Sequence, residues 1–225
     1  MSIRTQFLGV CIVPSIVLIA GLATMSHAQP VDPPPTWGID DGVSTSLTFL
    51  FNGDVHPPVP ELSVGFPGWT GGQMVLTGNT SWIAALNGRS GVIGFGPGAN
   101  GLGTLELTIG NLRNPSLFKE VFLQYDRLVT GGTGVGHTQG TDPNSQISNI
   151  QTAIVQLANG WERVTQTFVI TPQPSFEFFR FAITSDPTGG GVGIDNIYVH
   201  THCIPTPSAG LVLALGTLVG MRRRR

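Results

Sequence analysis

The hydrophobic pattern of this chain consists mainly of short runs in which apolar and polar residues alternate. Residues 104–109 (TLELTI) show it most clearly, because Leu105, Leu107 and Ile109 face one way and the residues between them are polar. A period of two is typical of a β-strand that buries one face. The run 117–129 also fits a short helix, but its β-branched and aromatic content favours a strand. Further strands are predicted at residues 44–51, 73–76, 81–86, 92–95, 147–157, 161–170, 176–184 and 192–200.

Glycine and proline separate these runs. Four segments contain too many glycines or prolines for regular strand pairing. We therefore expect loops at residues 56–60, 65–72, 96–103 and 130–144. The tripeptide Ala158-Asn159-Gly160 predicts a hairpin, since Asn-Gly readily takes the positive φ values of a tight turn. No stretch of the domain has the length and pattern of an amphipathic helix. The fold class is therefore predicted as all-β, a single two-sheet β-sandwich with jelly-roll topology over residues 44–202.

The last three predicted strands carry a resemblance to known extracellular sandwiches. Their sequences are WERVTQTFVI, FEFFRFAIT and GVGIDNIYVHTHC, and the sharpest piece is Gly193-Ile194-Asp195-Asn196-Ile197. They resemble the C-terminal half of carbohydrate-binding jelly-roll modules and of concanavalin-like β-sandwiches. The resemblance implies a polysaccharide as partner.

The N-terminal residues 1–28 have the three parts of a secretory signal peptide. Arg4 supplies the positive charge, an apolar stretch follows, and Ser26-His27-Ala28 forms a small-x-small cleavage site. An uncleaved signal anchor is the alternative. The polar, proline-rich lead at residues 29–43 favours cleavage after Ala28.

The C-terminal segment 203–225 combines Pro205-Thr206-Pro207, an apolar run at 209–221 and the four terminal arginines Arg222, Arg223, Arg224 and Arg225. The apolar run is shorter than the ~20 residues that cross a bilayer comfortably, and the arginines favour the cytoplasmic side. A plain membrane anchor and a short hydrophobic helix docked on the domain are the alternatives. A docked helix would need a polar face, and this run offers only Thr217.

This three-part layout resembles the PEP-CTERM sorting signal that exosortases process in Gram-negative bacteria, with Thr206 where the commonest form has Glu. The resemblance implies an exosortase-type processing enzyme as partner and transient anchoring in the inner membrane. The predicted destination is the cell envelope, the outer surface or the extracellular matrix.

Charge and cysteine content narrow the partners of the domain. Without Arg4 and the terminal arginines, six basic residues face thirteen acidic ones, which argues against a nucleic-acid partner. Cys11 leaves with the signal peptide, so Cys203 has no internal disulfide partner. Pairing between chains, a modification or simple packing remain open for Cys203.

Two groups of residues are candidate metal ligands. A carboxylate on Asp195 within a closing strand needs backbone N–H groups, an arginine or a cation as partner, and a structural Ca²⁺ is one option. Hydrogen bonding without metal is the favoured interpretation, because no Asp-rich calcium loop is present. His200 and His202 share a strand face, but no further ligands cluster beside them, and we expect a solvated pair. No cofactor is otherwise predicted.

Aromatic and acidic residues point to binding more than to catalysis. Trp69, in a glycine-rich loop, and Trp37 are the candidates for stacking on sugar rings, whereas Trp82 and Trp161 are expected in the core or at its rim. The acidic residues Glu106, Asp126, Glu162 and Glu177 occur singly and are expected to be solvated. We therefore expect a non-catalytic exported module that binds polysaccharide or packs in extracellular polymer. The alternative is a carbohydrate-active hydrolase whose carboxylates meet only in the folded chain.

Overall fold

The computed structural model describes residues 43–54, 57–66, 69, 71–96, 103–111, 114–130, 133–183 and 192–205. Strands make up most of this part, and the helical content within it is a single 3₁₀ turn at Ala158–Gly160. The strands are β1 (Ser44–Phe49), β2 (Leu62–Val64), β3 (Gly72–Thr77), β4 (Thr80–Leu86), β5 (Arg89–Phe95), β6 (Thr104–Gly110), β7 (Leu117–Leu128), β8 (Val135–Thr141), β9 (Gln146–Gln156), β10 (Trp161–Thr171), β11 (Phe176–Ile183) and β12 (Val192–Pro205).

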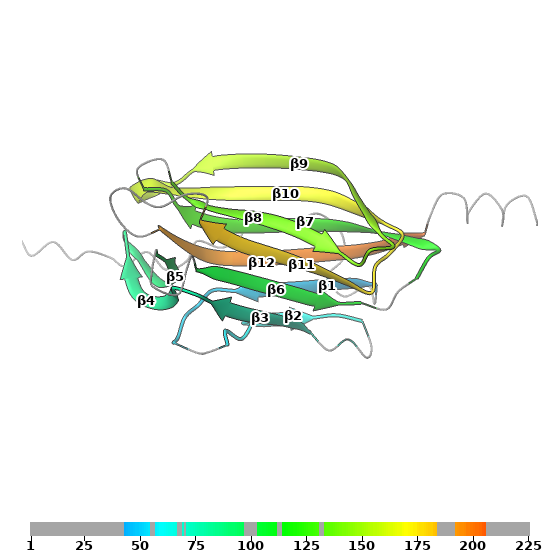
Figure 1. Cartoon of the computed structure of the whole chain (residues 1–225), viewed down its shortest axis with the longest axis horizontal. Coiled ribbons are helices and arrows are strands. Elements are labelled where there is room, and N and C mark those ends of the chain that lie inside the picture. Colours follow the sequence, from blue (N-terminus) through cyan, green and yellow to red (C-terminus); the bar gives the residue numbers. More distant parts are fainter. Residues whose placement is uncertain are drawn as a thin grey trace, which may run out of the picture.

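The strands form two antiparallel sheets, as the alternating pattern predicts (Figure 1). Sheet A has the order β2-β1-β12-β7-β10-β9, and the β4–β5 hairpin joins it through β12. Sheet B has the order β3-β6-β11-β8. The pairs β1·β12, β6·β11 and β7·β10 are nested along the chain, so segments far apart in the sequence lie side by side. The predicted all-β sandwich is confirmed.

The core lies between the two sheets and consists of the inward-facing residues of their strands. Leu105, Leu107 and Ile109 of β6 are buried, in agreement with the alternation of the sequence. Aromatic rings join the sheets across the core: Tyr125 of sheet A meets Phe181 of sheet B edge-on, with ring centroids 5.1 Å apart. The burial of these large side chains supplies most of the stabilisation of the sandwich.

All ten predicted strands are present, including the ambiguous run that forms β7, although several of their ends are shifted. The predicted hairpin is also confirmed, since Asn159 and Gly160 have φ values of 59° and 79°. The predicted loop at 130–144 is wrong in its second half, which forms β8. That strand, VGHTQGT, lacks apolar alternation because it pairs at the edge of sheet B and buries little beyond Val135. The short strand β2 was not predicted.

The last strand extends further than the sequence pattern predicted. Cys203, Ile204 and Pro205 continue β12 and pair with Lys119, Phe118 and Leu117 of β7. The predicted signal peptide, most of the proline-rich lead and the segment from Thr206 to Arg225 lie outside the described residues. Among the residues that the structure describes, no helix has the length and apolar character needed to span a membrane.

Candidate functional site

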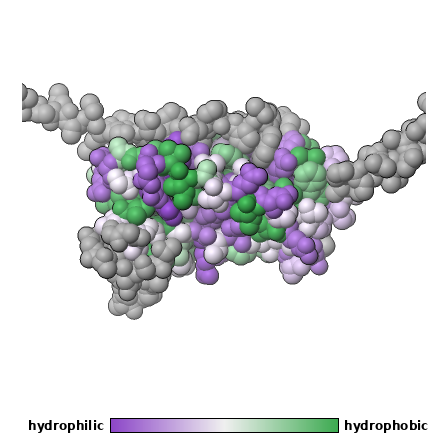
Figure 2. Space-filling model, turned by 90° about the horizontal axis from the view of Figure 1, so that it is seen from above, coloured by the Kyte–Doolittle hydropathy of each residue, from purple (hydrophilic) through white to green (hydrophobic). Residues whose placement is uncertain are grey.

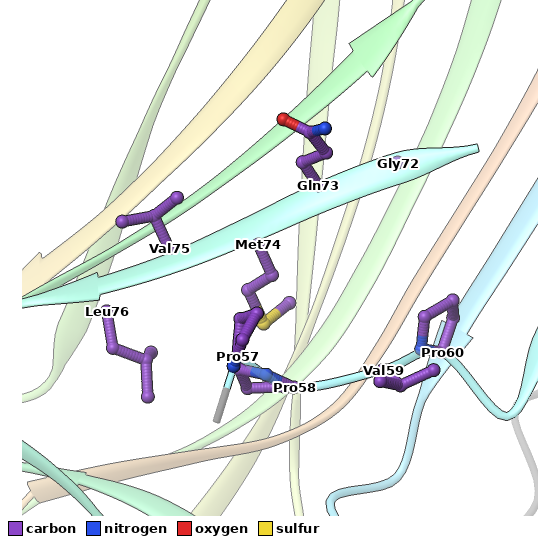
Figure 3. A pocket seen from close by; sticks show the side chains of 9 residues that line it. All are labelled: Pro57, Pro58, Val59, Pro60, Gly72, Gln73, Met74, Val75 and Leu76. Carbon is purple, nitrogen blue, oxygen red and sulfur yellow. The ribbon is translucent and has the colours of Figure 1, made fainter. Parts of the chain in front are cut away.

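A groove of about 700 Å³ opens along strand β3 (Figure 3). One wall is the strand itself and the other is the extended segment that leads into β2. The lining residues are Pro57, Pro58, Val59, Pro60, Gly72, Gln73, Met74, Val75 and Leu76.

The position of β3 in the sandwich explains why the groove is open. β3 is the edge strand of sheet B, and within the described part of the chain it pairs on one side only, with β6. Alternation points Met74 into the core, where it is buried, and leaves Val75 52% exposed. The three prolines lack backbone N–H groups, so their segment cannot pair fully with this edge and instead lies apart from it.

The described lining of the groove is uncharged. None of the described lining residues is acidic or basic, and Gln73 supplies the only side-chain amide. Polar groups also come from the backbone, because an edge strand presents N–H and C=O groups that no neighbouring strand uses. The site therefore combines apolar contact surface with a few neutral hydrogen-bonding groups.

The predicted sugar-stacking tryptophan does not line this groove. Trp69 is only partly exposed and packs against the core, and its ring lies directly over Gly65, where any Cβ would collide with it. Its indole N–H donates to the carbonyl of Gly110 at 2.9 Å. Trp37 lies outside the described residues. The expected packing of Trp82 and Trp161 is confirmed, since both contact hydrophobic clusters and Trp161 is 1% exposed.

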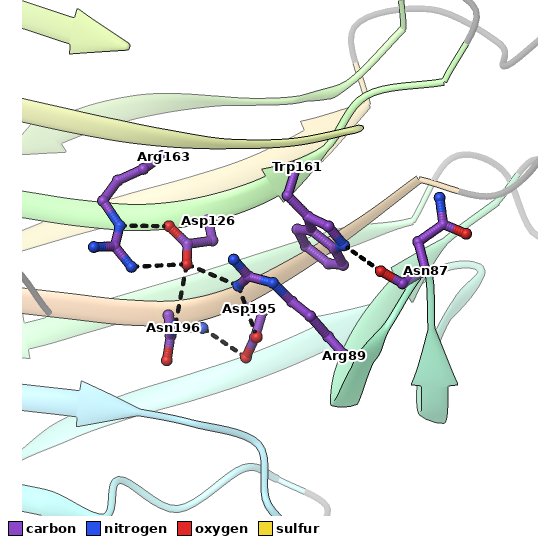
Figure 4. A network of polar contacts seen from close by, with 7 residues as sticks. All are labelled: Asn87, Arg89, Asp126, Trp161, Arg163, Asp195 and Asn196. Carbon is purple, nitrogen blue, oxygen red and sulfur yellow. Dashed lines mark hydrogen bonds and ion pairs between the residues drawn. The ribbon is translucent and has the colours of Figure 1, made fainter. Parts of the chain in front are cut away.

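A second constellation brings two carboxylates together at one end of sheet A (Figure 4). Asp126 of β7 accepts hydrogen bonds from Nε and Nη2 of Arg163 at 2.8 and 3.1 Å and from Nη1 of Arg89 at 2.7 Å. The same Nη1 donates to Asp195 of β12 at 3.0 Å. The backbone N–H of Asn196 donates to the other oxygen of Asp195 at 2.8 Å.

Burial and the arginines act on these carboxyls in opposite directions. Burial opposes the ionisation of Asp126, but the hydrogen bonds from Arg163 and the charge of Arg89 outweigh it and lower its pKa. For Asp195 burial dominates and raises the pKa to about 6, despite the nearby Arg89. Both aspartates have no exposed surface, and the guanidinium of Arg89 lies 4.4 Å from the ring centre of Trp161. This sealed arrangement suits a structural ion-pair network.

The predicted metal ligands are not brought together into a cluster. The positive partner of Asp195 is Arg89, one of the options that the sequence left open. Within the described segments, no three acidic, histidine or cysteine side chains lie close enough to share a metal ion. A structural Ca²⁺ at Asp195 would have to displace the guanidinium.

The prediction that His200 and His202 form a solvated pair is wrong. His200 has no exposed surface, and His202 is half-buried. Each shares a hydrogen bond through Nδ1 with a serine of β1, His200 with Ser46 at 2.5 Å and His202 with Ser44 at 2.8 Å. The ring of Tyr198 also stacks on His200, with the ring centroids 6.3 Å apart.

Two of the four acidic residues expected to be solvated are buried instead. Asp126 belongs to the network above, and Glu177 is 1% exposed and forms an ion pair with Lys119 at 2.7 Å. Asn111 contacts both members of this second pair. Glu162 is partly buried and bonds Arg127, while Glu106 is the most exposed of the four, with 41% of its side-chain surface accessible. The sequence around each acidic residue does not predict these ion pairs, because the basic partner lies on another strand.

Comparisons with known proteins do not assign the chain to a family. No family model matches it, and neither the curated proteins nor the solved structures include a significant match.

Proposed function

We propose that this protein is an exported, non-catalytic module of the bacterial cell surface or extracellular matrix, and that its groove along β3 binds a neutral polysaccharide. The observation that carries the proposal is the open, uncharged groove of about 700 Å³ between the edge strand and Pro57–Pro60. Its volume lies within the range of ~300–1,000 Å³ that is typical of ligand sites, and its lining is mostly apolar.

The lining suits a sugar chain. The C–H faces of sugar rings would pack on the prolines, while ring hydroxyls would bond the backbone groups of β3. The side chains of Gln73 and Val75 point to the other side of β3 from the prolines and would contact the sugar chain where it passes over the strand (Figure 3). The absence of charge among the described lining residues favours a neutral glycan over an acidic one. The excess of acidic residues in the exported part also disfavours polyanions.

The alternative, a hydrolase, would need two carboxylates on either side of a sugar chain. The described lining of the groove includes no acidic residue. Asp126 and Asp195 face each other but are buried and held by arginines. These contacts favour binding over catalysis.

Binding is tested on the span 29–205, which retains both sheets and every core residue named above, by arrays of neutral and acidic polysaccharides. We expect retention on a neutral polymer and its weakening by about threefold to tenfold in Gln73→Ala, because one hydrogen bond is lost. Val75→Asp should abolish retention. Gln151→Ala is the matched control, since it removes an exposed glutamine from a strand remote from the groove. Failure to bind any polysaccharide would overturn the proposal and leave a structural role.

The proposal that the protein is exported and sorted depends on its two terminal segments. We propose that residues 1–28 direct secretion and that Pro205-Thr206-Pro207 with Arg222–Arg225 directs sorting by an exosortase-type enzyme. Because Cys203, Ile204 and Pro205 belong to β12, the deletion that tests sorting should begin at Thr206. Loss of residues 206–225 should release the protein into the medium. Continued association of the truncated protein with cells would contradict the sorting role.

A further inference from the structure

Strand β9 ends sheet A with an unusually bare edge. Ten of its eleven residues are exposed, and within the described part of the chain it pairs on one side only, with β10. Figure 2 looks onto this side of the molecule and shows apolar patches between polar ones. Three of its side chains, Ile150, Ile154 and Val155, are 50–55% exposed.

The sequence of β9 has neither the charges nor the prolines that usually protect an edge strand. Natural edges are blunted by charged residues, prolines, β-bulges or short length. β9 and its flanks carry no charge from Pro143 to Trp161, and the strand QISNIQTAIVQ has no proline. A bulge opposite Thr167 and Val169, where Asn149 has a φ of 54°, kinks only the first part of the strand. From Gln151 to Gln156 the pairing with β10 is regular, and the outer edge of this part is open.

The exposed isoleucines lie on the inner face of sheet A, beyond the edge of sheet B. Ile154 pairs with Val164, whose side chain is buried in the core, so both point towards the inner side. Thr152 lies on the same face and accepts a hydrogen bond from Gln166 at 3.0 Å. Among the described strands sheet B ends at β8, and none of them pairs beyond β8 to lie opposite Ile150 and Ile154.

The polar contacts under β9 close the core at this edge and leave the isoleucines outside it. The Nε2–H of His137 donates to Oε1 of Gln166 at 2.9 Å, and Nδ1 of His137 meets the Tyr125 hydroxyl at 3.0 Å. These side chains seal the gap between the sheets. The apolar row of β9 is therefore a surface of its own and no continuation of the core.

We propose that β9 is a self-association edge that pairs antiparallel with β9 of a second copy of this chain. A two-fold axis at Thr152 sets Ile150 of each copy opposite Ile154 of the other, on the same face, which gives two pairs of β-branched apolar side chains. The neutral strand carries no charge that would repel its own copy. The two A sheets then continue into one another.

The size of this contact predicts a weak dimer. With the two-fold axis at Thr152, residues 148–156 of the two copies lie opposite each other. Nine residues at about 3.4 Å each give an edge of roughly 31 Å, and a strip of that length buries on the order of 650 Å² in total. Contacts of this area belong to weak or transient interfaces. β9 lies at the top of Figure 1 and β3 near the bottom, so self-association leaves the groove accessible.

Sedimentation of the span 29–205 from micromolar to millimolar concentration tests the inference. We expect a reversible monomer–dimer equilibrium in the wild type. The double variant Ile150→Lys/Ile154→Lys sets like charges opposite each other and should raise the dissociation constant at least about tenfold. Leu62→Lys is the matched control, because Leu62 is 39% exposed on β2, the other edge of the same sheet, and should leave the equilibrium unchanged.

A cross-linking arm tests the register independently of the lysine variants. Thr152→Cys places a thiol on the proposed two-fold axis, and a short thiol-reactive cross-linker should trap the dimer, whereas Leu62→Cys should stay monomeric. Wild-type protein, whose Cys203 is buried, reports any background reaction. A wild type that remains monomeric at every concentration, or a dimer that survives both lysines, overturns the proposal.

Discussion

Asp126 and Asp195 are register partners on the adjacent strands β7 and β12, and their carboxylates share one nitrogen, Nη1 of Arg89, at 2.7 and 3.0 Å. Two unscreened carboxylates at such a position would repel each other strongly. Arg89 lies between the two carboxylates and Arg163 binds Asp126 from the other side, and their positive charges offset this repulsion. The two aspartates differ in environment, because Asp126 has two arginines and Asp195 has one. That difference yields two separate predictions.

Asp126→Asn should destabilise the fold severely. The neutral amide cannot balance Arg89 and Arg163, which are 9% and 5% exposed, so two buried cations lose their main counter-ion. Breaking a buried pair in this way typically costs about 3–5 kcal/mol, and we expect a loss of that order in the free energy of unfolding in urea at neutral pH. Glu106→Gln removes an exposed pair with Arg180 and should cost less than about 1 kcal/mol. Equal effects of the two substitutions would show that the network contributes no more than a surface contact.

Asp195→Asn should alter how stability depends on pH. Burial raises the pKa of Asp195 to about 6, above its ordinary value of 3.8, so the folded state binds the proton more tightly than the unfolded chain. The corresponding stabilisation is complete below pH ~4 and disappears as the pH rises through about 6, a change on the order of 3 kcal/mol. Melting temperatures of wild type relative to Asp195→Asn should therefore fall between pH 4 and pH 7. A constant difference over this range would mean that Asp195 is not the titrating group.

The two-residue alternation made the fold predictable wherever a strand buries a continuous apolar face. Leu105, Leu107 and Ile109 identified β6 because each of them enters the core. The same signal fails for β8, whose side chains past Val135 are small or polar and whose place depends on pairing with β11. Edge strands of this kind are specified by their neighbours, and a single sequence does not display those neighbours.

The sites were less predictable than the fold, because tertiary pairing creates them. Arg89 lies 106 residues from Asp195 in the sequence, and nothing local links them. The sequence predicts that a buried Asp195 needs a partner, and an arginine is one of the possible partners. The sequence alone does not decide between an arginine, backbone N–H groups and a cation. The groove along β3 could not be predicted from the sequence either. Its two walls come from a proline segment and a strand that come together only in the folded sandwich.

Asn159 should tolerate glycine but not valine. The residue has a φ of 59° in the turn between β9 and β10, a conformation that asparagine and glycine adopt and that β-branched residues resist. Asn159→Val should therefore lower the free energy of unfolding by about 1–3 kcal/mol, whereas Asn159→Gly should change it by less than about 1 kcal/mol. Urea unfolding of both variants provides the measurement. A valine variant as stable as the glycine variant would contradict the turn geometry.

Lys119, the single lysine of the chain, should resist amine-reactive reagents in the native protein. Its side chain has no exposed surface, and its ammonium group binds Glu177 at 2.7 Å and also contacts Asn111. A reagent reaches it only when the sandwich opens, so intact-mass spectra should show labelling of the α-amino group alone until denaturant is added, and then a second label. Glu177→Gln removes the counter-ion of a buried cation and should both destabilise the fold and speed the second labelling step. Reaction of native Lys119 at the rate of the denatured chain would place this lysine at the surface and contradict the ion pair between the sheets.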